Sequence, residues 1–424
     1  MMSNRYPLWH GWEPMGPFIR NITEDRFIVR GEGIRVRDAS GRWFLDARSS
    51  CWNLSLGYSA QPVKDAIQRQ LNELPFGTIL VHEKIPQVTV RYARALSEIF
   101  GPALPFVRLG NSGSQMTETA VLLSRFVRTL EGNPERTAVL SFEDSYHGQG
   151  PGANAFSGSV ATESSCGPLL PDVHFVAVEG SWKDNVSEAL EELTPQRVTA
   201  VLVEPQMNAG TIPSPADLVD LAALCRSVGV HFIADEVTTG FGRTGAMSRC
   251  LDIGIEPDLL VLGKNMTSGY VPVGALLVSA PLYEIAYDPD PPLTLAAGST
   301  TDGHPLAAAA GLAVLDVYER DGILEHVKRV GTFLQKRLQD VHGKHGGVGD
   351  ITGAGLMQRF PLRDASGQPW TEESTDRLHS ACEDNRLLLS FGDDCLWLVP
   401  PLIVTEEDCE EIAAALDAAL ERVV

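Results

Sequence analysis

The sequence predicts an α/β protein with a mainly parallel central sheet flanked by helices, together with a smaller α+β domain. Short apolar runs without polar alternation recur between residues 106 and 279, as in strands that are buried on both faces of a sheet. Segments with helical spacing of apolar residues separate these runs, as the crossovers of a parallel sheet require. After about residue 310 the pattern changes to long helices and a few strands.

The chain length indicates more than one domain. A chain of 424 residues exceeds one ordinary hydrophobic core, so we expect a large domain and a smaller one. We assign residues 61–309 to the large domain and residues 310–424 to the small domain. The N-terminal segment, residues 1–60, is expected to contribute to the small domain.

The elements follow in chain order. Residues 28–46, with the turn DASGRW, predict a hairpin, and apolar residues at helical spacing predict helices over residues 62–74 and 87–100. A third helix is expected over residues 216–228, and the proline-rich segment 287–292 reads as a surface loop. The expected strands of the central sheet are residues 106–110, 137–142, 198–205, 230–236, 257–263 and 273–279, and the segment LLLSF, residues 387–391, is expected to be a further strand.

Composition excludes several classes of function. The net charge of −21 opposes non-specific binding to nucleic acid, and no apolar stretch is long enough to cross a bilayer. The N-terminus lacks a cationic segment followed by an apolar one, so we expect a cytoplasmic protein. Seven cysteines without a CxxC pair indicate reduced thiols, and the histidine spacings favour no metal site.

Ligands of such a sheet bind outside the carboxyl ends of its strands, and two segments there carry suitable side chains. In RLGNSGSQMTETA, residues 108–120, a strand runs into Gly113 and Ser114 before a helix that starts near Gln115. Free amides at a helix N-terminus bind phosphate, although an ordinary turn with a serine cap remains the alternative. In DSYHG, Tyr146 and His147 follow another strand; Tyr146 could cover a flat ring or belong to the core.

An acid and an amine follow two further strands. Asp235 ends an apolar strand, where a carboxylate is costly to bury without a cationic partner. Arg243 could supply that cation, or a ligand could. Lys264 follows the next strand, and apolar surroundings would lower the pKa of its amine and make it nucleophilic. A solvated lysine is the alternative.

These four signals together describe one ligand. It has a phosphate for Gly113 and Ser114, a ring for Tyr146, a basic ring nitrogen for Asp235 and an aldehyde for Lys264. Pyridoxal 5'-phosphate (PLP) meets all four requirements.

The chain also resembles the class III (ω-type) aminotransferases, which are PLP-dependent enzymes of fold type I, over essentially its whole length. DEVTTGFGRTG, with a lysine 29 residues after its aspartate, is the most specific match. The other matching stretches are LDARSSCWNLSLGY, GNSGSQMTETA, SYHG, VEP, LGKNMTSGYVPVGA, STTDGHPLAA and PPLIVTEED.

The resemblance implies roles for residues around the cofactor. Lys264 would hold the cofactor as a Schiff base and, once released, shuttle the 1,3-proton as general base and acid. Asp235 would pair with the pyridine nitrogen. Val237 would pack on the ring face opposite Tyr146, with His147 beside it.

The resemblance also implies a homodimer with shared active sites. Gly113 and Ser114 would hold the phosphate together with Thr300 from the partner subunit. Glu204, in VEP, would lie near Asp235 one layer behind the cofactor, and Trp52 would line the substrate pocket at the dimer interface.

Three departures from the family pattern concern the cofactor's surroundings. Many relatives have glutamate where this chain has Gln115, and glutamine where it has Thr238, which removes one expected hydrogen bond to the cofactor's phenolic oxygen. Asn208 stands where some relatives carry a glutamate that masks an arginine.

The arginine that grips an α-carboxylate is absent from both of its usual positions, which are Trp397 and Ser390 here. Arg386 or Arg48 could replace it. Trp397 is expected in the substrate pocket, although it could instead fill space between the domains. We therefore expect one substrate to be bulky, apolar or without an α-carboxylate.

The sequence thus predicts a PLP-dependent aminotransferase that works by a ping-pong mechanism through pyridoxamine phosphate. It would move an amino group between an amine or amino acid donor and an aldehyde or ketone acceptor, in a pathway that could belong to specialised metabolism. A racemase, epimerase or aminomutase on the same scaffold is the alternative, because it needs the same lysine and cofactor. A PLP-binding protein without catalysis is the third interpretation.

Overall fold

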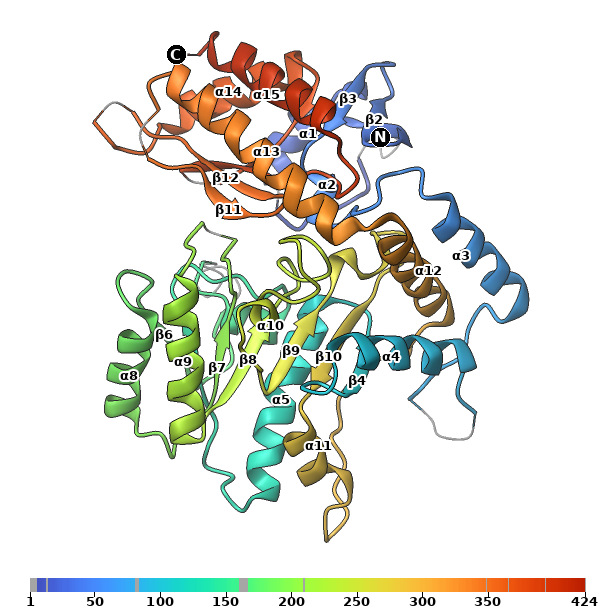
Figure 1. Cartoon of the computed structure of the whole chain (residues 1–424), viewed down its shortest axis with the longest axis vertical. Helices are drawn as coiled ribbons and strands as arrows, with labels where there is room; N and C mark the ends of the chain where they lie inside the picture. Colours follow the sequence, from blue (N-terminus) through green and yellow to red (C-terminus); the bar gives the residue numbers. More distant parts are fainter. Residues whose placement is uncertain are drawn as a thin grey trace.

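The computed structural model describes residues 6–12, 14–80, 84–159, 167–208, 210–347, 349–364, 366–392 and 394–423. Its lower half in Figure 1 contains the central sheet, and its upper half contains the C-terminal helices and two smaller sheets. Helices flank a mainly parallel central sheet, so the predicted α/β class is confirmed.

The central sheet has, within the described residues, the strand order β4-β10-β9-β8-β7-β5-β6. Only β10 runs antiparallel to its neighbours. The six predicted strands are confirmed with ends that differ by up to two residues. The bounds are β4 Phe106–Gly110, β5 Ala138–Phe142, β6 Val173–Val176, β7 Val198–Val203, β8 His231–Asp235, β9 Leu259–Leu262 and β10 Gly274–Val278.

The sheet is buried on both faces, as the unbroken apolar runs predict. Alternate residues of β7 belong to different apolar clusters: Leu202 packs with α5, and Val203 packs with the cluster that contains α9. The flanking helices include α4 Gln87–Phe100, α5 Gly113–Leu130, α8 Trp182–Leu193 and α9 Pro215–Val228, whereas α3 Gln61–Glu73 packs on the later helix α12 (Pro305–Asp321). Predicted helices 62–74, 87–100 and 216–228 correspond to α3, α4 and α9.

Two four-stranded sheets form among the remaining described residues. The predicted N-terminal hairpin is part of the first, in which β1 Ile28–Glu32, β2 Arg35–Asp38 and β3 Trp43–Asp46 are antiparallel neighbours. The expected single strand over residues 387–391 is wrong. Its first half, β13 Leu387–Leu388, pairs with β3, and its second half, β14 Ser390–Phe391, joins the sheet of β11 Thr352–Ala354, β12 Met357–Pro361 and β15 Cys395–Leu398.

Long helices connect the two halves of the molecule. Gly322, with a φ of +60°, separates α12 Pro305–Asp321 from α13 Ile323–Lys344. α12 packs on α3 and α4, whereas α13 packs on α15 Glu406–Leu420, which also contacts α14 Glu372–Asp384 (Figure 1). The expected boundary at 309/310 falls inside α12, so the division into domains stays a proposal.

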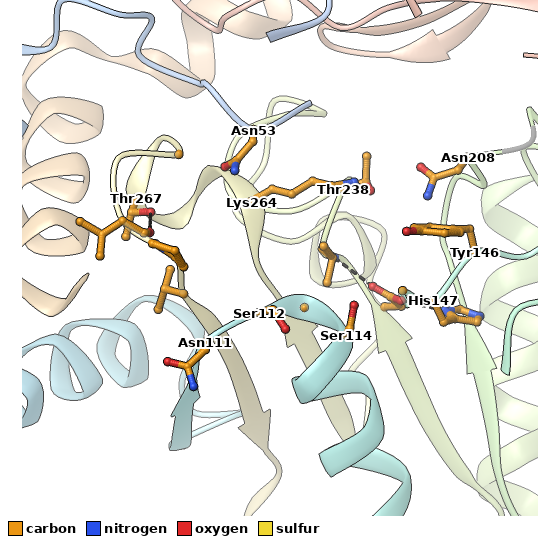
Figure 2. A pocket seen from close by; sticks show the side chains of 18 residues that line it. Asn53, Asn111, Ser112, Ser114, Tyr146, His147, Asn208, Thr238, Lys264 and Thr267 are labelled. Atoms are coloured by element: carbon orange, nitrogen blue, oxygen red, sulfur yellow. Dashed lines mark hydrogen bonds and ion pairs between the residues drawn. The ribbon is translucent and has the colours of Figure 1, made fainter. Parts of the chain in front are cut away.

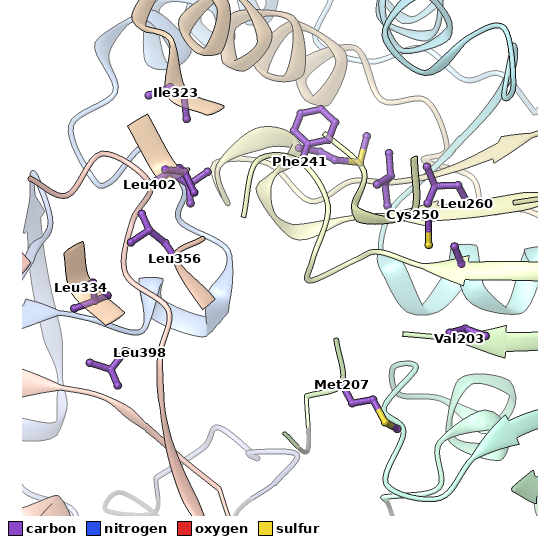
Figure 3. Packing of buried hydrophobic residues seen from close by; sticks show 14 of the residues in the cluster. Val203, Met207, Phe241, Cys250, Leu260, Ile323, Leu334, Leu356, Leu398 and Leu402 are labelled. Carbon is purple, nitrogen blue, oxygen red and sulfur yellow. The ribbon is translucent and has the colours of Figure 1, made fainter. Parts of the chain in front are cut away.

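One apolar cluster extends from the central sheet to the C-terminal sheet. Figure 3 shows Val203 and Leu260 of the central sheet at one end, Phe241 between, and Leu356 and Leu398 at the other end. The shorter helices are α1 Met15–Asn21, η1 Glu24–Arg26, α2 Ser49–Trp52, α6 Pro151–Phe156, α10 Arg249–Asp252, η2 Lys264–Thr267 and α11 Ala280–Tyr287. None of the helices in the described residues has the length and apolarity needed to span a membrane.

Candidate active site

A cavity of about 300 Å³ lies where β8 and β9 end and α5 begins. Figure 2 shows Lys264 extending across it toward Thr238, with Tyr146 and His147 on the far wall and Ser112 and Ser114 at the start of α5. Seven predicted site residues line this cavity: Gly113, Ser114, Tyr146, His147, Asp235, Val237 and Lys264.

The first turn of α5 combines a helix cap with an open anion site. Ser112 is the cap, because its Oγ accepts a hydrogen bond from the backbone N–H of Gln115 at 3.2 Å. The N–H groups of a first helical turn have no partner within the helix, so they are free to bind an anion. A Cβ at Gly113 would lie 2.7 Å from Cγ2 of Val237, so only glycine permits this close approach.

Asp235 is 5% exposed and is held by two hydrogen bonds. Its Oδ2 lies 2.7 Å from Nδ1 of His147, and its Oδ1 accepts from the backbone N–H of Val237 at 3.1 Å. The alternative of a salt bridge to Arg243 is wrong. Arg243 is fully buried elsewhere and donates to the carbonyl oxygens of Leu356 and Pro400.

Glu204 lies behind this wall of the cavity. Its two carboxylate oxygens accept from the backbone N–H groups of Tyr146, at 2.8 Å, and Asn208, at 3.4 Å. The pKa of Glu204 is raised to about 7, chiefly by burial; His147 opposes this rise and the nearby charge of Asp235 adds to it. Glu204 therefore sits next to the Asp235–His147 pair without lining the cavity.

Lys264 is held between a hydroxyl and an aromatic ring. Its Nζ donates to Oγ1 of Thr238 at 2.7 Å and lies 5.3 Å from the ring centroid of Trp52. Burial of the amine lowers the pKa of Lys264, which favours the neutral, nucleophilic form. The φ of Lys264 is +40°, a conformation that is costly for a residue other than glycine and is often found at functional sites.

Aromatic side chains gather near the cavity. The ring centroids of Trp52 and Trp397 are 5.3 Å apart, and Trp52 donates from Nε1 to Oγ of Ser390 at 2.9 Å. Trp12 lies 6.4 Å from Tyr146, ring centroid to ring centroid. Sequence reasoning missed Trp12, because nothing in its local pattern connects the N-terminal segment to this wall.

Neither Trp52 nor Trp397, the two expected substrate residues, lines the cavity. Trp397 is 2% exposed and packs in a cluster with Met357 and Val399, against which Trp52 rests. Trp397 thus fills space in the C-terminal sheet and supports the tryptophan that faces Lys264, and its place in the substrate pocket stays a proposal.

The two arginines considered as carboxylate ligands lie elsewhere. Arg386 is exposed and its guanidinium lies 5.6 Å from the ring centroid of Phe44. Nε of Arg48 lies 4.0 Å from Oδ1 of Asp46. Neither residue lines the cavity.

Thr300 is exposed and lies outside the cavity lining. Gln115, where many relatives have glutamate, makes one hydrogen bond that a glutamate carboxylate could not make, the donation from its amide to Asp302. Its Nε2 donates to Asp302 at 2.8 Å, while its Oε1 accepts from the backbone N–H of Asn111 at 2.8 Å.

The residues of the cavity fit PLP. The turn at Gly113 offers backbone N–H groups to a phosphate, Asp235 offers a buried acid to a ring nitrogen, and Lys264 offers an amine to the aldehyde. Val237 and Tyr146 line the space between them. His147 supports the acid and keeps its buried Nε2 without a hydrogen-bond partner among the described residues.

Comparisons with known proteins point to the same cofactor. A family model for the class III aminotransferases matches residues 19–420. A probable aminotransferase of Mycobacterium tuberculosis is 32% identical over 419 residues, which cover 93% of this chain and 89% of that protein. A diaminobutyrate–2-oxoglutarate transaminase of Halomonas elongata is 28% identical, covering 99% of this chain and 95% of that protein.

A solved structure agrees over the whole length. The PLP-bound amine transaminase from an uncultivated Pseudomonas species superposes with a TM-score of 0.94 at 28% identity, and the match covers 99% of each chain. The predicted family, fold type and cofactor are thereby confirmed. The chain belongs to the class III aminotransferases and uses pyridoxal phosphate as its cofactor.

Proposed function

We propose that this aminotransferase works by a ping-pong mechanism between an amine or amino acid donor and an aldehyde or ketone acceptor. One of its substrates is bulky, apolar or without an α-carboxylate. The observation that carries this proposal is a cavity whose described lining contains Tyr146 and no arginine, with Trp12 beside Tyr146 and Trp52 beside Lys264. Specialised metabolism is one setting in which such a substrate occurs.

The bound cofactor supplies an electron-withdrawing ring and an aldehyde that takes up the substrate's amino group. Asp235, oriented by His147, keeps the ring nitrogen protonated in this proposal. Lys264 would hold the cofactor and, when free, would take the proton from the amine-bearing carbon of the substrate and deliver it to the carbon of the cofactor's aldehyde group. Thr238 and the ring of Trp52 hold the free amine of Lys264 beside the cavity, which supports this role.

We also propose a homodimer in which Thr300 of each subunit completes the phosphate site of the other. The exposed position of Thr300, outside its own subunit's cavity, supports this arrangement. Trp52 belongs to the substrate pocket at the same interface in this proposal.

The cysteine pattern supports a cytoplasmic location: no disulfide joins the described cysteines, and Cys166 lies outside the described residues.

The test is a panel of half-reactions with purified holoenzyme. Each donor is mixed with the enzyme alone, and the absorbance change of the cofactor from its aldehyde to its amine form is timed. We expect aryl-alkyl amines without a carboxylate to react faster than glutamate, and Trp52→Ala to slow the bulky amines selectively. Efficient reaction of glutamate that Trp52→Ala and Trp397→Ala leave untouched would overturn the proposed substrate class.

A further inference from the structure

The segment that carries Thr300 is hydrogen-bonded to the turn that opens α5. Asp302, which is 3% exposed, accepts hydrogen bonds at Oδ1 from Nε2 of Gln115, at 2.8 Å, and from Nδ2 of Asn111, at 3.0 Å. Asn111 and Gln115 stand on either side of Ser112, Gly113 and Ser114, which line the cavity. One buried carboxylate thus reaches the proposed phosphate-binding turn of its own subunit.

The same carboxylate also holds the segment around Thr300. Oδ2 of Asp302 accepts from the backbone N–H of Ser299 at 3.0 Å, and the backbone N–H of Asp302 donates back to the Ser299 carbonyl at 3.1 Å. On the other side of Thr300, the hydroxyl of Thr301 donates to Oδ1 of Asn111 at 2.9 Å. Both neighbours of the exposed Thr300 are therefore fixed. The hydroxyl of Thr300 has no hydrogen-bond partner within the described residues.

The charges explain why residue 115 is a glutamine here. A glutamate at this position would place a second carboxylate against Asp302, and like charges at hydrogen-bond distance repel each other strongly in a buried site. Gln115 instead presents an amide N–H group to Asp302 and a carbonyl oxygen to Asn111. A glutamine at position 115, where many relatives have glutamate, therefore suits the carboxylate of Asp302.

We propose that Asp302 is a positioning residue that fixes Thr300 of one subunit so that its hydroxyl meets the cofactor phosphate of the partner subunit. This inference rests on the proposed function, in which Thr300 acts across a homodimer. Asp302 touches neither substrate nor cofactor in this proposal, and it acts on Thr300 through the backbone of Ser299 and through Asn111, which holds Thr301. Its removal is therefore expected to weaken cofactor binding mainly in the site that receives the affected Thr300.

The first test is a double-mutant cycle on PLP affinity. Asp302→Asn keeps the shape but has one acceptor oxygen for three N–H donors, so it cannot hold both Ser299 and the side chains of Asn111 and Gln115. We expect Asp302→Asn and Thr300→Val each to weaken PLP binding roughly tenfold, the loss expected for one hydrogen bond to a charged group. The double variant is expected to be no weaker than Thr300→Val alone, because one residue acts through the other. Asp288→Asn, at an exposed carboxylate that follows α11, is the matched control and should bind PLP as the unmodified protein does.

Hybrid dimers then separate the two subunits. The first hybrid dimer combines one Asp302→Asn subunit with one Lys264→Ala subunit. Its only intact Lys264 receives Thr300 from the subunit whose Asp302 is intact. PLP affinity at this site, measured by trapping PLP on Lys264 with borohydride, should therefore return to normal. In a hybrid of the unmodified chain with Asp302→Asn/Lys264→Ala, the intact Lys264 receives a poorly held Thr300, so the affinity should be weak. The opposite pattern would mean that Asp302 acts on its own subunit's turn, and the inference would be overturned.

The outcomes keep this inference apart from the proposed function. If Thr300→Val leaves PLP affinity unchanged in a dimer, the proposed role of Thr300 fails, and Asp302 loses its target with it. If Thr300→Val weakens binding but Asp302→Asn does not, or if the two losses add, only the positioning role of Asp302 is rejected. Should Asp302→Asn fail to fold, Gln115→Glu replaces it, because the added charge repels Asp302; light scattering checks that each variant remains a dimer.

Discussion

At the residue scale, Glu204 is a buried carboxyl group that the proposed reaction does not use directly. Burial raises its pKa to about 7, above its ordinary value of 4.5. Between these two values the folded protein keeps a proton that the unfolded chain has lost, so the free energy of unfolding falls as pH rises through this window.

Glu204→Gln should remove this dependence. The expected result is that the variant loses little stability with rising pH, whereas the unmodified apoprotein loses stability between about pH 5 and about pH 8. Urea unfolding of both proteins across this range measures the difference, with the exposed Glu188→Gln as the control. A stability difference that is the same at every pH would contradict the raised pKa of Glu204.

The chemistry of Asp235 and Lys264 could be predicted because each follows a recognisable strand. Their immediate partners could not, because the contacts join residues far apart in the chain. His147 reaches Asp235 from 88 positions away, and Thr238 reaches Lys264 from 26 positions away. Local patterns carry no information about such pairs, and the same reason hid Trp12 and the bonds of Asp302.

At the element scale, the approach of α5 to the loop after β8 depends on one glycine. A Cβ at Gly113 would lie 2.7 Å and 2.8 Å from the two methyl groups of Val237. Gly113→Ala should therefore push α5 and its N–H groups away from the cavity, with a stability loss of about 1–3 kcal/mol and weaker PLP binding.

Removing the obstructing methyl groups should reverse this effect. Gly113→Ala/Val237→Ala is expected to recover much of the PLP affinity, because the added Cβ then has room. PLP titrations and urea unfolding of the two variants and of Val237→Ala alone complete the cycle. If the double variant binds PLP no better than Gly113→Ala, steric contact with Val237 is not what makes glycine necessary.

The sequence predicted elements well where one pattern covers a whole element. α4 begins and ends at the predicted residues, because its apolar stripe is uninterrupted. The edge strand β6 escaped prediction because it is short and half exposed, with His174 in its middle. The split of LLLSF into β13 and β14 depends on pairing with β3 and β15, and no local signal announces a change of sheet.

At the scale of the whole molecule, Arg243 joins the loop after β8 to the C-terminal part of the chain. The fully buried guanidinium donates from Nη1 to the carbonyls of Leu356, at 3.0 Å, and Pro400, at 2.5 Å. These residues adjoin β12 and β15, which carry the side chains that support Trp52.

Arg243→Lys should loosen this connection, since the lysine side chain is one bond shorter and its Nζ falls short of the position from which Nη1 donates to both carbonyls. We expect a loss of about 1–3 kcal/mol in the free energy of unfolding, as for a buried group left without its hydrogen bonds, and a raised KM for the amine donor. Arg226→Lys, at an exposed position, should change neither quantity. Unchanged stability and KM in Arg243→Lys would show that the guanidinium does not hold the two parts together.

The central claim is that Lys264 binds the aldehyde of one PLP molecule while Asp235 binds the ring nitrogen of the same molecule. The most direct measurement is reduction of the holoenzyme with borohydride, followed by digestion and mass mapping of the labelled peptide, with Lys264→Ala as the control. The account predicts a single label at Lys264 and none in the variant. A label at another lysine, or equal labelling of the Lys264→Ala protein, would contradict it.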